Sequence, residues 1–218
     1  MVAEGVFTTA NLVSYCSAED VLALLRAYDT SEWGAEEELL VEVVETLARA
    51  RSAIEAMAGR DFFLHANETV RLDGSGSRVL LLGASGLTPV VSVERIGVNG
   101  RELADDAWLF YADEAAVVMA ASSRYGRQFP EGAQNVEVTL DWGYEETPGE
   151  IRSAQAKLAA AELLARHTGE QGGVEAVSLG DYTVRYGSEG RFAHTIRRLV
   201  AEAREAAARY RRLDFRAI

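Results

Sequence analysis

The chain has 218 residues, enough for one large domain or one domain with an insert, and its hydrophobic content of 48% and charged content of 26% are ordinary for a globular protein. No apolar run approaches the length of a membrane span, and the acidic start of the sequence does not resemble a signal peptide. Cys16 is the only cysteine, which excludes an intrachain disulfide, so we expect a reducing compartment. From the lack of a membrane span we expect no membrane partner.

The net charge of −12 is distributed unevenly along the chain. Residues 185–218 hold nine arginines and four carboxylates, a net charge of +5, so the remaining residues carry −17. An acidic body with a basic final segment predicts complementary docking, either to another copy of the chain or to an acidic partner.

Two helices are predicted in the N-terminal part of the sequence. The first covers residues 17–28, where Ser17 is a candidate N-cap and Asp20 follows it three positions later. The second covers residues 36–58, where apolar side chains recur every three or four positions and Gly59 is placed to end the helix.

Between residues 64 and 143 the apolar period changes from that of helices to that of short strands. One hairpin is predicted to pair residues 69–72 with 79–82, and another to pair 90–98 with 101–103 across the turn residues Asn99-Gly100. Further strands are predicted at residues 108–111, 116–120 and 136–140. Six or seven short strands of this kind favour a small antiparallel barrel or sandwich.

A third helix begins abruptly after a Trp-Gly-Tyr turn, with Thr147 as the predicted cap, Pro148 as the first helical residue and Glu150 completing a capping box. Its apolar residues form two stripes rather than one: Ile151, Ala154, Leu158, Ala161 and Ala165 on one, and Ala156, Ala159, Ala160 and Leu163 on the other. A helix that is apolar on two faces is buried from two sides. We therefore predict that the second stripe, Ala156, Ala159, Ala160 and Leu163, contacts a neighbouring subunit.

A short extended pair is predicted around Gly180-Asp181, followed by a last helix over residues 189–212 with an apolar face and an opposite arc of arginines. Two interpretations of this arc stay open. Pairs such as Arg198 with Glu202 indicate a solvated face, whereas the surplus of arginine near the C-terminus indicates a charged interface. The residues proposed for docking to a portal or another partner are Arg209, Arg211, Arg212, Leu213, Phe215 and Arg216.

The predicted class is therefore α+β, a helical domain of about four helices made from residues 1–63 and 144–218, with residues 64–143 as a β-rich insert. Signals of chemistry are scarce in this sequence. His65, His167 and His194 lie in unrelated segments without metal-ligand spacing, and no Gly-rich phosphate-binding loop with a lysine is present. We predict no enzymatic activity, no metal and no cofactor.

Four stretches together resemble the head–tail connector proteins of tailed double-stranded-DNA phages, also called adaptor or head completion proteins. These stretches are SAEDVLALLRAYD, ARARSAIEAMAGRDFF, the segment VEVTLDWGYEETPGEIRSAQAKLAAAELLAR, and VSLGDYTVRYG with the helix after it. The resemblance covers residues 17–63 and 136–213. Its middle departs from the family pattern, because about eighty residues lie where short family members have a direct connection or a small strand pair.

The resemblance implies a virion structural protein of the neck, assembled in the host cytoplasm. It implies a homo-oligomeric ring, a dodecamer in this family, that lies beneath the portal protein, extends the DNA channel and joins the filled head to the next neck or tail-completion protein. DNA would pass through the ring without specific binding, which suits an acidic chain. The alternatives are a cytoplasmic nucleic-acid-binding or regulatory module that uses the basic last helix, and an enzyme with a site in the β insert.

Overall fold

The structure is a computed structural model that describes residues 14–28, 33, 35–121, 123, 126–168, 174–179, 182–188 and 190–211. The chain divides into two compact units. A helical unit combines the described residues up to Arg60 with those of Thr147–Arg211, and a β unit is formed by Asp61–Glu146. Four helices together with antiparallel sheets confirm the predicted α+β class. Among the described helices, none has a long enough apolar stretch to cross a membrane.

The second helix has the ends that the sequence predicts, whereas the first begins as predicted but ends at Leu25 rather than at residue 28. Helix α1 (Ala18–Leu25) begins with a capping box, in which the Ser17 hydroxyl accepts a bond from the Asp20 amide and the Asp20 carboxylate accepts one from the Ser17 amide at 2.8 Å. The bond from the Ser17 amide to the Asp20 carboxylate, and after it the bond that the Ser17 hydroxyl donates to the same carboxylate, lower the pKa of Asp20. Helix α2 (Glu36–Ala58) ends at Gly59, whose φ of 67° lies in the left-handed region that glycine adopts without strain.

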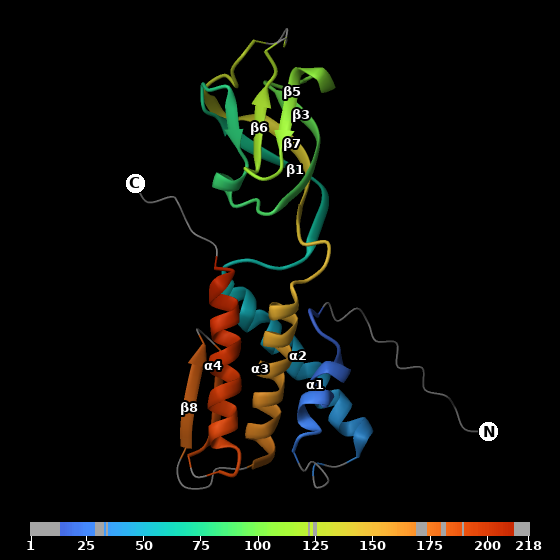
Figure 1. The fold of residues 1–218 in the computed structure, drawn as a ribbon, viewed down its shortest axis with the longest axis vertical. Coiled ribbons are helices and arrows are strands. Elements are labelled where there is room, and N and C mark those ends of the chain that lie inside the picture. Colours follow the sequence, from blue (N-terminus) through green and yellow to red (C-terminus); the bar gives the residue numbers. More distant parts are fainter. Residues whose placement is uncertain are drawn as a thin grey trace, which may run out of the picture. The chain divides into compact units, whose positions relative to one another are not determined.

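Helix α3 (Gly149–Thr168) is the central element of the helical unit and contacts α1, α2, α4 (Ala193–Arg209) and strand β9 (Tyr182–Gly187) (Figure 1). Strand β8 (Val174–Leu179) pairs with β9 in an antiparallel hairpin that lies along α4, which confirms the extended pair expected around positions 180 and 181. Because neighbours pack against it from more than one side, α3 needs apolar side chains on more than one face.

The last two helices begin later than predicted. The Pro148 carbonyl accepts bonds from the Ile151 and Arg152 amides, so α3 starts one residue after the expected first position. Helix α4 starts at Ala193 rather than 189, because residues 190–192 form a turn in which the Gly190 carbonyl accepts a bond from the Ala193 amide. It ends at Arg209 rather than 212.

A buried glutamine joins three parts of the helical unit that lie far apart in the sequence. The Gln155 side chain is fully buried in α3, and its Oε1 accepts bonds from the Tyr15 amide at 2.8 Å and the Cys16 amide at 2.9 Å. Its Nε2 donates to the Ser14 hydroxyl and to the Leu47 carbonyl on α2, both at 2.9 Å. All polar atoms of the amide are therefore paired, which removes the cost of burying it.

The β unit consists of two antiparallel sheets. The four-stranded sheet has the order β1-β7-β3-β4 and the three-stranded sheet the order β2-β6-β5. Both contribute residues to one hydrophobic core, which includes Leu80, Ile96, Val117 and Val138. The described strands form separate sheets and no closed barrel. The strands are β1 (Leu64–Gly74), β2 (Val79–Leu81), β3 (Val90–Val98), β4 (Arg101–Glu102), β5 (Trp108–Tyr111), β6 (Ala116–Met119) and β7 (Gly132–Gly143).

One predicted hairpin is confirmed and the other is wrong. Strands β3 and β4 pair across Asn99 and Gly100, whose φ values of 51° and 74° suit a tight hairpin turn. In contrast, β1 and β2 do not pair with each other: β1 pairs with β7, and β2 pairs with β6. The Gly-Ser-Gly turn between β1 and β2 passes the chain from one sheet to the other instead of closing a hairpin.

We expect the helical unit to fold without the β unit. Residues Leu64 and Gly143, at the two ends of the insert, are cross-strand partners, so a short Gly-Ser linker can replace residues 64–143 without stretching the chain. The shortened protein should keep its helical circular dichroism and melt cooperatively, with the full-length chain as the control. Loss of cooperative melting would show that the helical core depends on the insert.

Candidate interaction surfaces

The residues predicted to form a subunit contact on α3 lie inside the helical unit. Ala156 is 4% exposed, and Ala159, Ala160 and Leu163 are fully buried by elements of the same chain. The other apolar stripe of α3, from Ile151 to Ala165, is buried as well. A neighbouring subunit would reach these side chains only if the packing of the helical unit changed. The predicted subunit contact through α3 therefore stays a prediction, and it requires such a change in packing.

The residues predicted to dock on a portal are only partly described. Arg212, Leu213, Phe215 and Arg216 lie outside the described residues, and Arg211 is an exposed residue just after α4. Arg209 is paired within the unit, with Glu150 on α3 at 2.9 Å and with Glu205 at 2.8 Å. Its bond to Glu205 is the main cause that raises the pKa of Arg209. Arg209 therefore has carboxylate partners within the helical unit, one of them four residues earlier on the same helix.

Most charges on the outer arc of α4 also have partners in the same unit. Arg198 pairs with Glu202 at 3.2 Å, and Lys157 on α3 pairs with the same carboxylate at 2.9 Å. These two cations, the lysine first, lower the pKa of Glu202. The pair between Arg198 and Glu202 is the one that the sequence predicts for a solvated helix face. Exposed pairs of this kind contribute little to stability.

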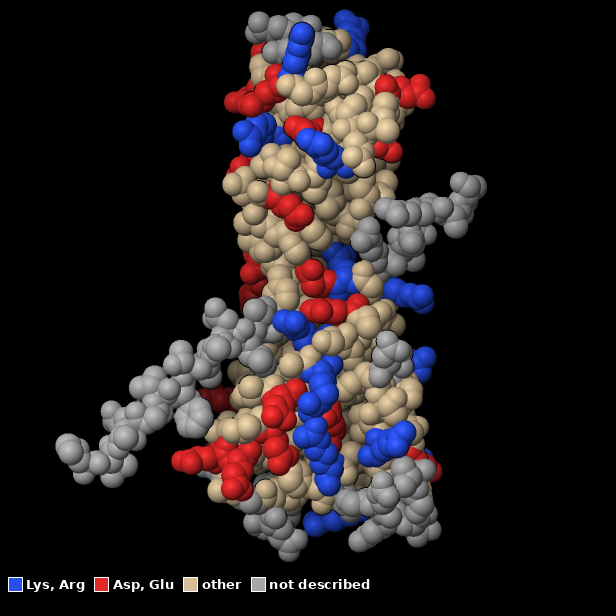
Figure 2. All heavy atoms as spheres, turned by 180° about the vertical axis from the view of Figure 1, so that it is seen from behind, with Lys and Arg blue, Asp and Glu red and all other residues tan. Residues whose placement is uncertain are grey.

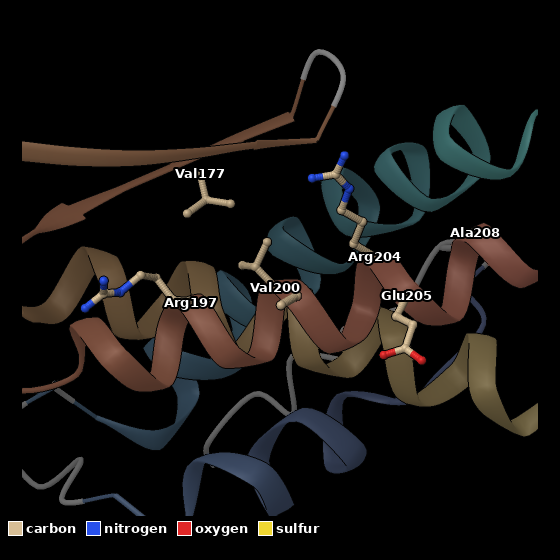
Figure 3. A pocket seen from close by; sticks show the side chains of 7 residues that line it. Val177, Arg197, Val200, Arg204, Glu205 and Ala208 are labelled. Atoms are coloured by element: carbon tan, nitrogen blue, oxygen red, sulfur yellow. The ribbon is translucent and has the colours of Figure 1, made fainter.

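Two arginines of α4 differ from the rest, because they lie beside a groove between α4 and the β8–β9 hairpin. The groove has a volume of about 390 Å³. Arg197 and Arg204 project from α4 on either side of Val200, and Val177 faces Val200 from the hairpin (Figure 3). The remaining lining residues are Ala201, Glu205 and Ala208. We name this surface the basic groove.

The cations of the basic groove have no carboxylate partner among the described residues. The Arg197 Nε donates only a long bond, 3.4 Å, to the Ala193 carbonyl, and neither Arg197 nor Arg204 takes part in an ion pair within the described part of the chain. Both arginines belong to the basic arc that the sequence predicts for the last helix, without being predicted as docking residues. Their separation by seven residues, two helical turns, with Val200 between them is the signal that marks a shared face.

The β unit exposes an apolar sheet face that the sequence analysis missed. In the three-stranded sheet, Val79 is opposite Val118, which is opposite Leu109. The next row is Leu81, Ala116 and Tyr111, of which Ala116 is buried and the other two are exposed. Leu81 is 55% exposed and Leu109 is 52% exposed. The other face of these strands contributes Leu80 and Val117 to the core. Apolar residues at consecutive positions, as in these strands, are the signal of a sheet covered on both faces.

The remaining chemistry-bearing residues have structural surroundings. His65 and His167 each lie within 3.0 Å of a carboxylate, that of Asp61 and Glu42 respectively. Burial raises the pKa of the Cys16 thiol to about 12, so the thiol stays protonated and unreactive at neutral pH. Across the ranges that the structure describes, no three His, Cys, Asp or Glu side chains are grouped to hold a metal ion.

Comparison with known proteins finds several similar solved structures, among them chains of two neck assemblies. The chain is similar to a chain of the "Neck of empty GTA particle computed with C6 symmetry", with 18% identity, a TM-score of 0.45, and coverage of 91% of this chain and 90% of the other. It is also similar to a chain of the "Neck of native GTA particle computed with C12 symmetry", with 19% identity, a TM-score of 0.41, and coverage of 78% and 82%. No protein-family model and no curated protein sequence matches. A likeness of this extent leaves the function open.

Proposed function

We propose that this chain is a structural protein of the neck of a phage-like particle, a head–tail connector that forms a ring beneath the portal. The observation that carries the proposal is the composition of the helical unit. Most of the residues that resemble connector proteins form the helical unit, in which α1, α2, α3, the β8–β9 hairpin and α4 fold together, whereas residues 136–146 of the third stretch belong to the β unit. The residues that depart from the family pattern, 64–135, all lie in the separate β unit.

The proposed mechanism is mechanical rather than catalytic. Subunits in a closed ring extend the DNA channel of the portal, and the strongly acidic composition of the chain, with a net charge of −12, disfavours adhesion of phosphates to the channel wall. The segment after α4 carries Arg211 and Arg212 and docks on an acidic, partly apolar site of the portal. The apolar face of the β2-β6-β5 sheet is the surface offered to the next neck or tail-completion protein.

Purified components test whether the chain forms a ring and whether that ring docks through its C-terminal segment. The full chain should form rings in negative-stain images and should bind filled heads that carry the portal, as measured by co-sedimentation. Arg211→Glu combined with Arg212→Glu should reduce binding to heads by at least tenfold, because each reversal replaces an attraction to carboxylates with a repulsion. The isolated variant should keep the circular dichroism of the wild type, because Arg211 is exposed.

The control variant for this test carries Arg71→Glu and Arg101→Glu, which change the charge equally at exposed positions of the β unit, although Arg71→Glu also removes an ion pair with Glu137. Equal loss of head binding by the control and the docking variant would contradict docking through the C-terminal segment. A chain that never associates with heads would contradict the connector function itself. A salt-dependent shift of DNA by the isolated chain, lost in the Arg211/Arg212 variant, would favour the alternative, a nucleic-acid-binding module.

A further inference from the structure

The basic groove is suited to a partner that is acidic and partly apolar. Val177 is half-buried, and Ala201 and Ala208 are exposed, so the groove offers apolar surface beside its two arginines. Arginine is well suited to interface ion pairs, because its planar guanidinium binds a carboxylate through two parallel bonds. An occupant must therefore present carboxylates at the edges of a small apolar group.

The first half of α2 has the complementary chemistry. Val41 is 54% exposed and Leu40 is 37% exposed, and the neighbouring carboxylates of Glu37, Glu38 and Glu45 are exposed as well. At 100° per residue, Glu38, Val41 and Glu45 lie on one outward face of the helix. The carboxylates of Glu37, Glu38 and Glu45 take part in no ion pair with another described residue. We name this surface, Glu37, Glu38, Leu40, Val41 and Glu45, the acidic ridge.

The basic groove and the acidic ridge lie on opposite sides of the helical unit. Helix α3 packs between α1 and α4, with the β8–β9 hairpin outside α4 and the start of α2 beside α1 (Figure 1). Figure 2 shows acidic side chains gathered at the edge of the helical unit where α1 and the start of α2 lie. The two surfaces of one molecule therefore cannot meet, whereas those of two molecules can.

We propose that the acidic ridge of one copy docks in the basic groove of the next copy, and that this contact joins the subunits of the ring. Val41 would lie against the apolar part of the groove, with Arg197 and Arg204 pairing with the carboxylates of the ridge. A contact between two different surfaces of identical subunits is heterologous, so it repeats from copy to copy and closes into a ring when the rotation permits. The inference rests on the ring of the proposed function and assigns its subunit interface.

The test is a charge exchange between the two surfaces. A groove variant carries Arg197→Glu and Arg204→Glu, and a ridge variant carries Glu38→Arg and Glu45→Arg. Each variant alone should assemble at least tenfold more weakly than the wild type by mass photometry, because like charges then face each other at the contact. An equimolar mixture should assemble again, because every contact in an alternating ring joins opposite charges. A chain with all four substitutions should also assemble.

Control variants change the same charges on the β unit: Arg71→Glu with Arg101→Glu, and Glu94→Arg with Glu131→Arg, all at exposed positions. These controls should assemble like the wild type. Circular dichroism of each variant checks that it is folded, and the mixture keeps the test decisive if one variant is partly destabilised.

Three outcomes would overturn the assigned contact: groove and ridge variants that assemble like the wild type, a mixture that stays unassembled, or a wild-type chain that stays monomeric at all concentrations. Binding to filled heads is measured separately on the same proteins. Wild type that binds heads while the exchange fails would leave the connector function standing without this interface. Wild type that assembles and responds to the exchange but never binds heads would support the contact and contradict the connector function.

Discussion

Replacing Leu158 by alanine is expected to lower the free energy of unfolding of the helical unit by about 2–5 kcal/mol. Leu158 is fully buried in α3, the helix that contacts α1, α2, α4 and β9. Removing three carbon atoms from the centre of this packing leaves a cavity that the surrounding helices cannot fill without moving together. Urea unfolding followed by circular dichroism at the helix band measures the change.

The matched control for Leu158→Ala is Ser153→Ala, an exposed position on the same helix, where the free energy of unfolding should change by less than about 0.5 kcal/mol. A companion substitution, Ala160→Leu, adds volume to the same core and should cost about 1–3 kcal/mol. From the sequence alone, Ala160→Leu is expected to disturb assembly more than folding. Burial of Ala160 in the single chain reverses this order, and a variant of unchanged stability would contradict it.

Replacing Gly143 by alanine is expected to destabilise the β unit by about 3 kcal/mol or more, the sum of backbone strain and a collision. Gly143 has a φ of 96°, a conformation that a side chain opposes, and an added Cβ would collide with the Phe63 carbonyl oxygen. That oxygen accepts a bond from the Tyr144 amide, so it cannot move away freely. Thermal unfolding followed by tryptophan fluorescence reports on this end of β7, because Trp142 is the preceding residue.

Gly100→Ala separates the two causes of the Gly143→Ala effect. Gly100 also has a positive φ, 74°, but an added Cβ would meet no atom within 4 Å. Its substitution should therefore cost only the strain, about 1–2 kcal/mol. Equal losses at the two positions would show that the Phe63 carbonyl yields to the new methyl group.

Local signals in the sequence were enough to predict the ends of several elements. The capping box of Ser17 and Asp20, the left-handed Gly59 and the Asn99-Gly100 turn each act within a few residues of backbone. Such short-range preferences depend on a few neighbouring residues. The start of the first helix, the end of the second helix and the β3–β4 hairpin can therefore be predicted from the sequence.

Pairings over long distances could not be predicted in the same way. Leu72 pairs with Val136 across the β1–β7 register, although a Gly-rich turn follows β1 and suggested a hairpin with β2. Turn residues permit a reversal of the chain but do not choose the partner strand. That choice depends on which strands can bury Leu80, Ile96 and Val138 in a common core, a property of the assembled sheets.

The candidate surfaces show the same division between sequence and tertiary structure. The sequence by itself determined that α3 is apolar on two faces and that α4 carries a basic arc, because helical periodicity depends only on spacing. Only the tertiary structure decided that both faces of α3 are covered within one chain. Tertiary structure also placed Glu150, fifty-nine residues away in sequence, beside Arg209. It placed Arg197 and Arg204, which form no ion pair with another described residue, at the edge of a groove. The physical reason is that burial and charge pairing depend on which segments meet in space, and residue spacing along one helix carries no information about its neighbours.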